Sequence, residues 1–110
     1  MAAAWIDDEH LSVMSCQHGR PMGRHAGYIV ISDLFGEPTL ALRIPWYVPV
    51  LDLGPAGAVY TEGWDRVVVS QGMVAKATKR VINTRRIYPP LTGERADLPA
   101  AAAPELQARP

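Results

Sequence analysis

A run of short apolar segments between residues 28 and 70 constrains the fold more than any other part of this sequence. The segments are rich in Val, Ile and Tyr, and Gly, Pro and Asp residues separate them at short intervals. Branched and aromatic side chains favour strands, whereas the separating residues favour turns. The stretch therefore predicts a small sheet that holds most of the aliphatic side chains of the chain.

The periodicity within this stretch sets the expected strands. Residues 28–33 are apolar on both faces, as in a central strand, and residues 39–44 alternate between apolar and polar positions. Prolines border and interrupt residues 46–53, which places this strand at an edge or a bulge because proline donates no ladder hydrogen bond. The remaining expected strands are 58–61 and 65–70, which form a hairpin, and a short edge strand at 10–16. Residues 17–27 hold three glycines and a proline, and they predict a loop.

The periodicity changes after residue 70. Residues three and four positions apart now share their character, so we predict a helix from about residue 71 to residue 86, with Ser70 as its N-cap. The apolar side of this helix would carry Met73, Val74, Ala77, Val81, Thr84 and Tyr88. Its basic side would carry Lys76, Lys79, Arg80, Asn83 and Arg86, with Arg85 elsewhere on the helix.

These elements define the expected fold class, which is α+β with the strands dominant. We expect a small antiparallel sheet or partial barrel of about five strands, followed by one C-terminal amphipathic helix. A single globular domain would cover residues 10–91, after a flexible arm at residues 1–9. Residues 92–110 are rich in Pro and Ala and predict an extended or disordered tail.

Composition limits the classes of partner and compartment. Eleven Lys and Arg residues balance eleven Asp and Glu residues among the 110, so the net charge does not indicate a polyanionic partner. The single cysteine permits no intrachain disulfide, which favours a reducing compartment. The first residues lack the features of a secretory signal, and no apolar run has the length needed to span a bilayer. We expect a cytoplasmic protein, or one within an assembled particle, with no membrane partner.

Four residues of types that bind metals fall close together in the sequence: His10, Cys16, His18 and His25. This is the number of ligands that a structural zinc site needs. The spacing argues against zinc, because only one residue separates Cys16 from His18, whereas paired zinc ligands usually lie further apart. A small metal-binding protein stays as an alternative, and we expect no cofactor.

The basic side of the predicted helix is a second candidate site. Lys76, Lys79, Arg80 and Arg86 would neutralise phosphates there, and Asn83 could reach a base edge. A solvated helix face beside acidic loops explains the same pattern. A regulator that binds nucleic acid is therefore an alternative function.

Aromatic residues at the expected sheet edge and hairpin tip form the third candidate. Trp46 and Tyr47 lie on the edge strand, Trp64 lies at the tip, and Trp5 lies in the N-terminal arm. Large aromatic side chains in such places are common anchors for protein partners. No catalytic motif accompanies them. The leading hypothesis is a non-enzymatic protein–protein interaction module, a structural or adaptor subunit of a larger assembly such as a phage particle, with self-association included.

Overall fold

The computed structural model describes residues 4–88 and 91–102. The chain divides into two compact units. The first unit contains the described residues 4–45 and 92–102, and the second contains residues 46–88 and 91.

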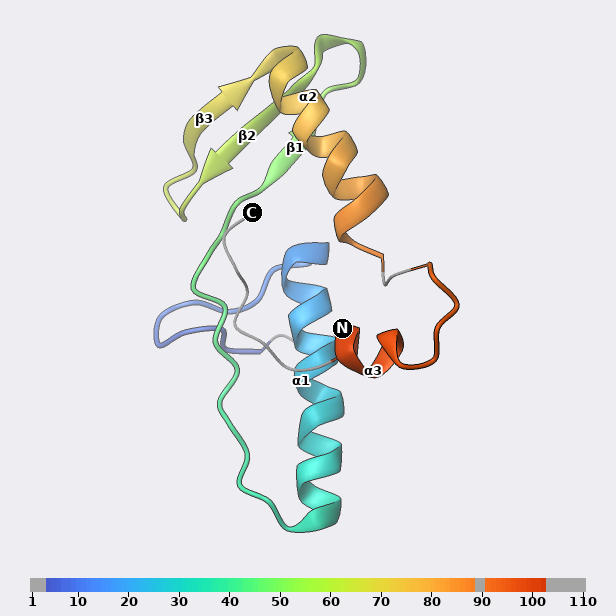
Figure 1. The fold of residues 1–110 in the computed structure, drawn as a ribbon. Helices are drawn as coiled ribbons and strands as arrows, with labels where there is room; N and C mark the ends of the chain where they lie inside the picture. Colours follow the sequence, from blue (N-terminus) through green and yellow to red (C-terminus); the bar gives the residue numbers. More distant parts are fainter. Residues whose placement is uncertain (1–3, 89–90, 103–110) are drawn as a thin grey trace. The chain divides into compact units, whose positions relative to one another are not determined.

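A long helix, α1 (Cys16–Phe35), is the main element of the first unit (Figure 1). Its first turn is capped by Ser15, whose Oγ accepts a hydrogen bond from the backbone N–H of His18. Its last turn is closed by Gly36, which has a φ of 68° and donates its N–H to the carbonyls of Ser32 and Asp33. Glycine adopts this left-handed conformation without steric cost, so Gly36 ends the helix efficiently.

The expected strand at 28–33 and the expected loop at 17–27 are both wrong, because both segments belong to α1. An apolar run of this length fits a helix as well as a strand, and the capping residues at 15 and 36 decide between them. Each glycine inside a helix disfavours the helix by about 1 kcal/mol relative to alanine, and the internal Pro21 disfavours it by about 3 kcal/mol. The two caps and the tertiary contacts of the helix override that preference.

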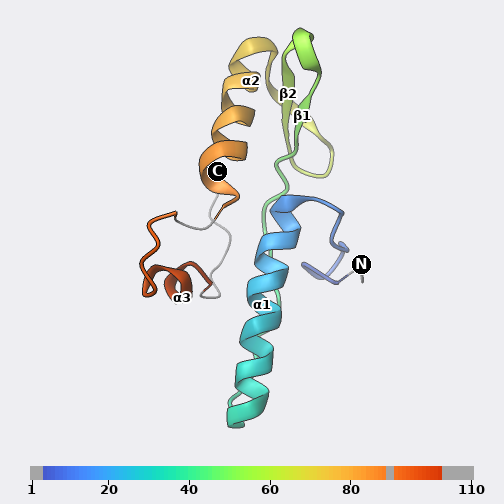
Figure 2. The ribbon, with the colours of Figure 1, turned by 90° about the vertical axis from the view of Figure 1, so that its right-hand side faces the viewer.

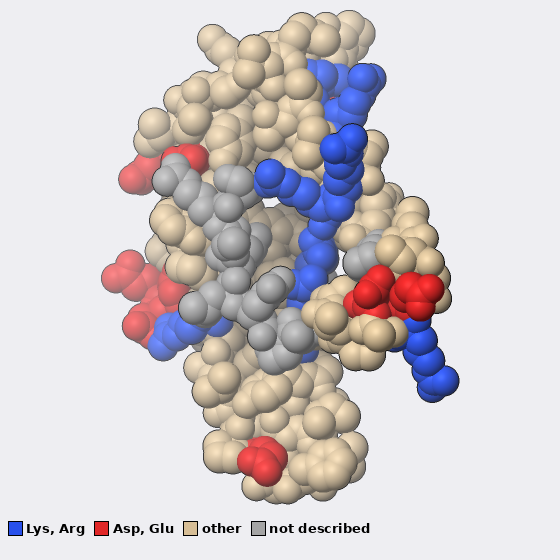
Figure 3. Space-filling model, in the orientation of Figure 1, with Lys and Arg blue, Asp and Glu red and all other residues tan. Residues whose placement is uncertain are grey.

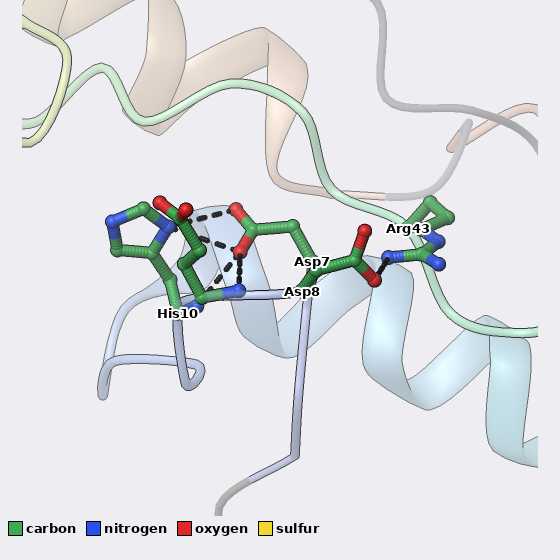
Figure 4. Close-up of polar contacts among 5 residues, drawn as sticks. Asp7, Asp8, His10 and Arg43 are labelled. Carbon is green, nitrogen blue, oxygen red and sulfur yellow. Dashed lines mark hydrogen bonds and ion pairs between the residues drawn. The ribbon is translucent and has the colours of Figure 1, made fainter.

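The N-terminal segment pairs with the segment that follows α1 (Figure 4). Ile6 and Ile44 are almost fully buried, and the N–H of Ile44 donates to the carbonyl of Ile6 at 2.9 Å. Beside them, Arg43 Nη1 lies 2.8 Å from Asp8 Oδ1. The expected strand at 39–44 is wrong, since these residues join no sheet. The expected strand at 10–16 is reduced to one isolated bridge between Trp5 and Leu11.

The second unit is an antiparallel sheet in the order β1-β2-β3 with a helix against one face (Figures 1 and 2). The strands are β1 (Val50–Asp52), β2 (Ala58–Glu62) and β3 (Val67–Gln71), and a short 3₁₀ turn at Gly54–Ala56 joins the first two. The helix α2 (Gly72–Val81) continues into a π-helical turn at Ile82–Arg86. These elements confirm the hairpin at 58–70 and the helix near 71–86. The N-cap is Gln71, not Ser70, and it makes no side-chain cap hydrogen bond.

The expected fold class is therefore wrong. The described residues contain three antiparallel strands in an open sheet and three α-helices, of which the third, α3, spans Asp97–Ala102. The five-stranded, mostly β arrangement fails because α1 takes the residues of one expected strand and residues 39–44 stay outside the sheet. The extended tail is contradicted at α3, and residues 103–110 lie outside the described part.

Two glycines bring the start of β2 against the start of α2. Gly57, with a φ of 102°, precedes β2, and Gly72 begins α2. A Cβ atom at position 57 would lie 2.5 Å from the carbonyl carbon of Gly72. Real Cβ atoms do not approach backbone so closely, so this junction requires glycine.

Gly57→Ala should therefore destabilise the second unit by about 3 kcal/mol, from the clash together with the unfavourable backbone conformation. Gly54→Ala is the matched control, because Gly54 also has a positive φ, of 61°, but its added Cβ meets nothing within 4 Å. It should cost only about 1 kcal/mol. Urea unfolding followed by circular dichroism measures both, and equal losses would show that the close approach contributes nothing.

Candidate functional site

One side of α1 exposes large apolar residues near its C-terminal end. Leu34 and Phe35 are 73% and 75% exposed, and Val30 and Ile31 are each more than half exposed. On the other side of the helix, His18 and Ser32 are buried. A helix with apolar residues outside its buried side usually packs against a further layer of protein.

Glycines continue this exposed side toward the N-terminus of α1. Gly19, Gly23 and Gly27 recur every four residues, so they share one helix face with Ile31. A Cβ atom added to any of the three would meet nothing within 4 Å. Because these glycines lie inside a helix, they differ from the glycines of a phosphate-binding loop, which precede a helix. We call Gly19, Gly23, Gly27, Val30, Ile31, Leu34 and Phe35 the α1 face.

The apolar side of α2 also points away from the protein interior. Met73 and Val74 are 69% and 72% exposed, and Ala77 and Val81 are exposed as well. The side that contacts the sheet carries the buried Ala75. The sequence predicted which residues share this side but did not indicate that it faces solvent. We call Met73, Val74, Ala77 and Val81 the α2 face.

The basic residues of α2 divide into two groups. Lys76 binds within its own unit, since its Nζ lies 2.6 Å from Asp52 Oδ1 and 3.1 Å from the carbonyl of Gly54. The hydrogen bond from Lys76, helped by the N–H of Gly54, lowers the pKa of Asp52 below its usual value. Lys79 is half-buried, whereas the other predicted phosphate-binding residues are exposed: Arg80, Asn83 and Arg86, together with Arg85. Figure 3 shows Lys and Arg side chains gathered over α2.

The predicted aromatic anchors are divided between the two units. The Tyr47 and Trp64 rings stack with centroids 4.4 Å apart, and the Arg66 guanidinium lies 5.9 Å from the centroid of the Tyr47 ring. Tyr47 is only 9% exposed, so its ring serves mainly to hold the β2–β3 hairpin against residues 46–48. Trp46 and Trp64 keep about two-fifths of their surface exposed, and Trp5, in the other unit, keeps more.

The predicted metal ligands have separate environments. His10 Nδ1 lies 2.9 Å from Asp7 Oδ2, Cys16 is exposed, and the rings of His25 and Tyr28 lie 6.0 Å apart. Among the described residues, no three His, Cys, Asp or Glu side chains are grouped so that they could hold a metal ion. The four predicted ligands therefore do not form one metal site.

His18 has a structural position at the start of α1. Its side chain is fully buried, and its Nδ1 accepts a hydrogen bond from the N–H of Val13 at 2.9 Å. An accepting nitrogen carries no proton, so this bond requires the neutral ring. Burial lowers the pKa of His18 below its usual value of 6.5.

The stability of the first unit should accordingly depend on pH. Because the unfolded chain binds a proton at His18 more readily than the folded one, stability is full above about pH 6.5 and falls as the pH drops through the lowered pKa. His18→Asn, which keeps an acceptor and does not titrate, should reduce this loss, whereas the control His25→Asn should retain it. Unfolding midpoints at pH 7.5 and 5.5 measure the difference. A His18→Asn variant with the full wild-type loss would contradict this account.

No helix in the described part of the chain has the length and apolar character required to cross a membrane.

Comparison with known proteins gives a relationship to a longer protein. The chain is 77% identical, over all of its 110 residues, to NADH dehydrogenase-like proteins of Mycobacterium tuberculosis strains CDC 1551 / Oshkosh and H37Rv. It spans 28% of the length of these curated relatives. No family model and no solved structure matches the chain.

Proposed function

We propose that this chain is the docking portion of an NADH-oxidising enzyme. Its α1 face packs against the remaining part of such an enzyme, and that part supplies the NADH site. The proposal keeps the interaction role expected from the sequence and places it in an enzyme instead of a phage particle.

The observation that carries this proposal is the uncovered α1 face. Burying a Leu or Phe side chain typically contributes about 1.5–3 kcal/mol, and four large apolar residues of α1 are more than half exposed. The relatives contain further sequence that could cover them, because the chain spans only 28% of their length. Because this chain and the matched part of the relatives are 77% identical, we expect the two to pack in the same way.

The glycines of the α1 face indicate how the docking element approaches. Without side chains at positions 19, 23 and 27, the backbone of another element can come close to the helix along one stripe. Close approach increases the number of dispersion contacts, each of which is weak alone. The apolar residues that follow would then anchor the same element at the C-terminal end of α1.

A chimera tests whether this chain acts as a working part of the enzyme. The 110 matched residues of the M. tuberculosis relative are replaced by this chain, and NADH oxidation is followed with an added dye as the electron acceptor. The chimera should oxidise NADH at about the rate of the intact relative, and this chain alone should not. A chimera that folds and binds NADH but does not oxidise it would contradict the proposal.

Gly23→Leu within the chimera tests the docking face itself. Leucine favours a helix over glycine by about 0.8 kcal/mol, and position 23 has free space, so the isolated chain should not be destabilised. In the chimera, the added side chain should block close approach and lower NADH oxidation at least tenfold. Ala41→Leu is the matched control, because it adds a leucine side chain at an exposed position outside the helices. Equal rates for the two variants would show that the α1 face is not a docking surface.

A further inference from the structure

We propose that two copies of this chain pair through the outer edge of β3, so that the three strands of each copy join in one continuous sheet. The inference concerns the second unit alone. It does not depend on the proposed enzyme, and its test needs no NADH.

The strand β3 is an open edge of the sheet. In the order β1-β2-β3 it pairs with β2 alone, so no further strand of the described residues lies on its other side. Val67, Val68 and Val69 are each more than half exposed. Because successive strand residues point to opposite faces, both faces of this edge are open to a partner.

The residues of β3 lack the charges and prolines that protect most sheet edges. No Asp, Glu, Lys, Arg or Pro occurs between Arg66 and Lys76. A bulge twists the strand, but it also leaves Val69 with no partner residue on β2. The opposite edge is protected, since β1 has only three residues, Pro49 precedes it and Asp52 lies within it. The contrast indicates that β3 is the edge that accepts another strand.

A second copy of β3 fits this edge. Antiparallel pairing about a two-fold axis at Val69 would set Val67 against Gln71 of the other copy and Val68 against Ser70. No like charges meet in this register, because β3 is uncharged. The same surface is used in both copies, so the contact closes at two chains instead of continuing as a fibre.

The charges beside β3 are complementary in this arrangement. Asp65 precedes β3 and α2 follows it, so antiparallel pairing brings Asp65 of each copy near the start of α2 of the other. The first turn of α2 contains no acidic residue, and its N-cap Gln71 makes no side-chain cap hydrogen bond. A carboxylate is favourable there, because the N-terminus of a helix carries partial positive charge. Arg66 binds within its own unit, where its Nη2 lies 3.4 Å from Tyr47 Oη.

Light scattering on the full chain tests the proposal. The mass of the wild type should reach that of two chains as the concentration rises to about 1 mM, at which even a dimer with a millimolar dissociation constant is populated. Val69→Lys should raise the dissociation constant at least tenfold, because two like charges then lie opposite each other. Leu51→Lys is the matched control, since it adds the same charge at an exposed position of β1 and should leave the dimer unchanged.

A mixture of two variants tests the two-fold arrangement itself. At a concentration where the wild type is dimeric, Val69→Lys and Val69→Glu should each be monomeric alone. An equimolar mixture of the two should form dimers, because opposite charges then meet across the axis. Circular dichroism confirms that each variant folds.

Three results would overturn the proposal. The first is a wild type that stays monomeric over the whole range, as expected if β3 pairs with a strand of a different protein. The second is equal dimerisation of Val69→Lys and Leu51→Lys, as expected if two copies meet through the α1 face or the α2 face. The third is a mixture of the Lys and Glu variants that stays monomeric.

Discussion

Among the residues that the structure describes, each unit buries few large apolar side chains, and this shortage shapes the rest of the structure. The first unit fully buries Ile6 and Ile44, and the second buries Tyr47 and Val48 with the small Ala58 and Ala75. Many other large apolar residues lie at the surface, concentrated on α1, α2 and β3. Because burial of apolar area is the main favourable term in folding, such faces are most simply explained as surfaces that another layer covers.

The second unit is held together by local geometry more than by a large core. The approach of Gly57 to Gly72 lets the start of β2 lie directly against the start of α2. The ion pair between Lys76 and Asp52 then joins the helix to the opposite edge strand. These contacts use backbone and polar groups, so they leave the apolar side of α2 outside. The same geometry explains why Lys76 is a structural residue and Arg80 is an exposed one.

The sequence predicted the parts of the fold that local signals determine. The hairpin at 58–70 has strand-favouring residues on both sides of a short connection that contains Gly63, and the helix near 71–86 has a clear helical period; both are observed. The segment 28–33 was misassigned because its apolar residues fit either period, and the signals that resolve it lie at Ser15 and Gly36. The side on which α2 meets the sheet depends on the two glycines and on Ala75, which no periodicity reveals. The α1 face was missed because residues 17–27 were predicted as a loop and residues 28–33 as a strand, although Gly19, Gly23 and Gly27 recur at a helical spacing.

The central claim is that α1 is an internal helix of a larger enzyme. Hydrogen–deuterium exchange of the amides of residues 27–35 tests it most directly, measured in this chain alone and in the chimera with the M. tuberculosis relative. If the α1 face is covered, these amides should exchange at least tenfold more slowly in the chimera, while those of α2 change less. Equal exchange of the α1 amides in the two proteins would contradict the claim.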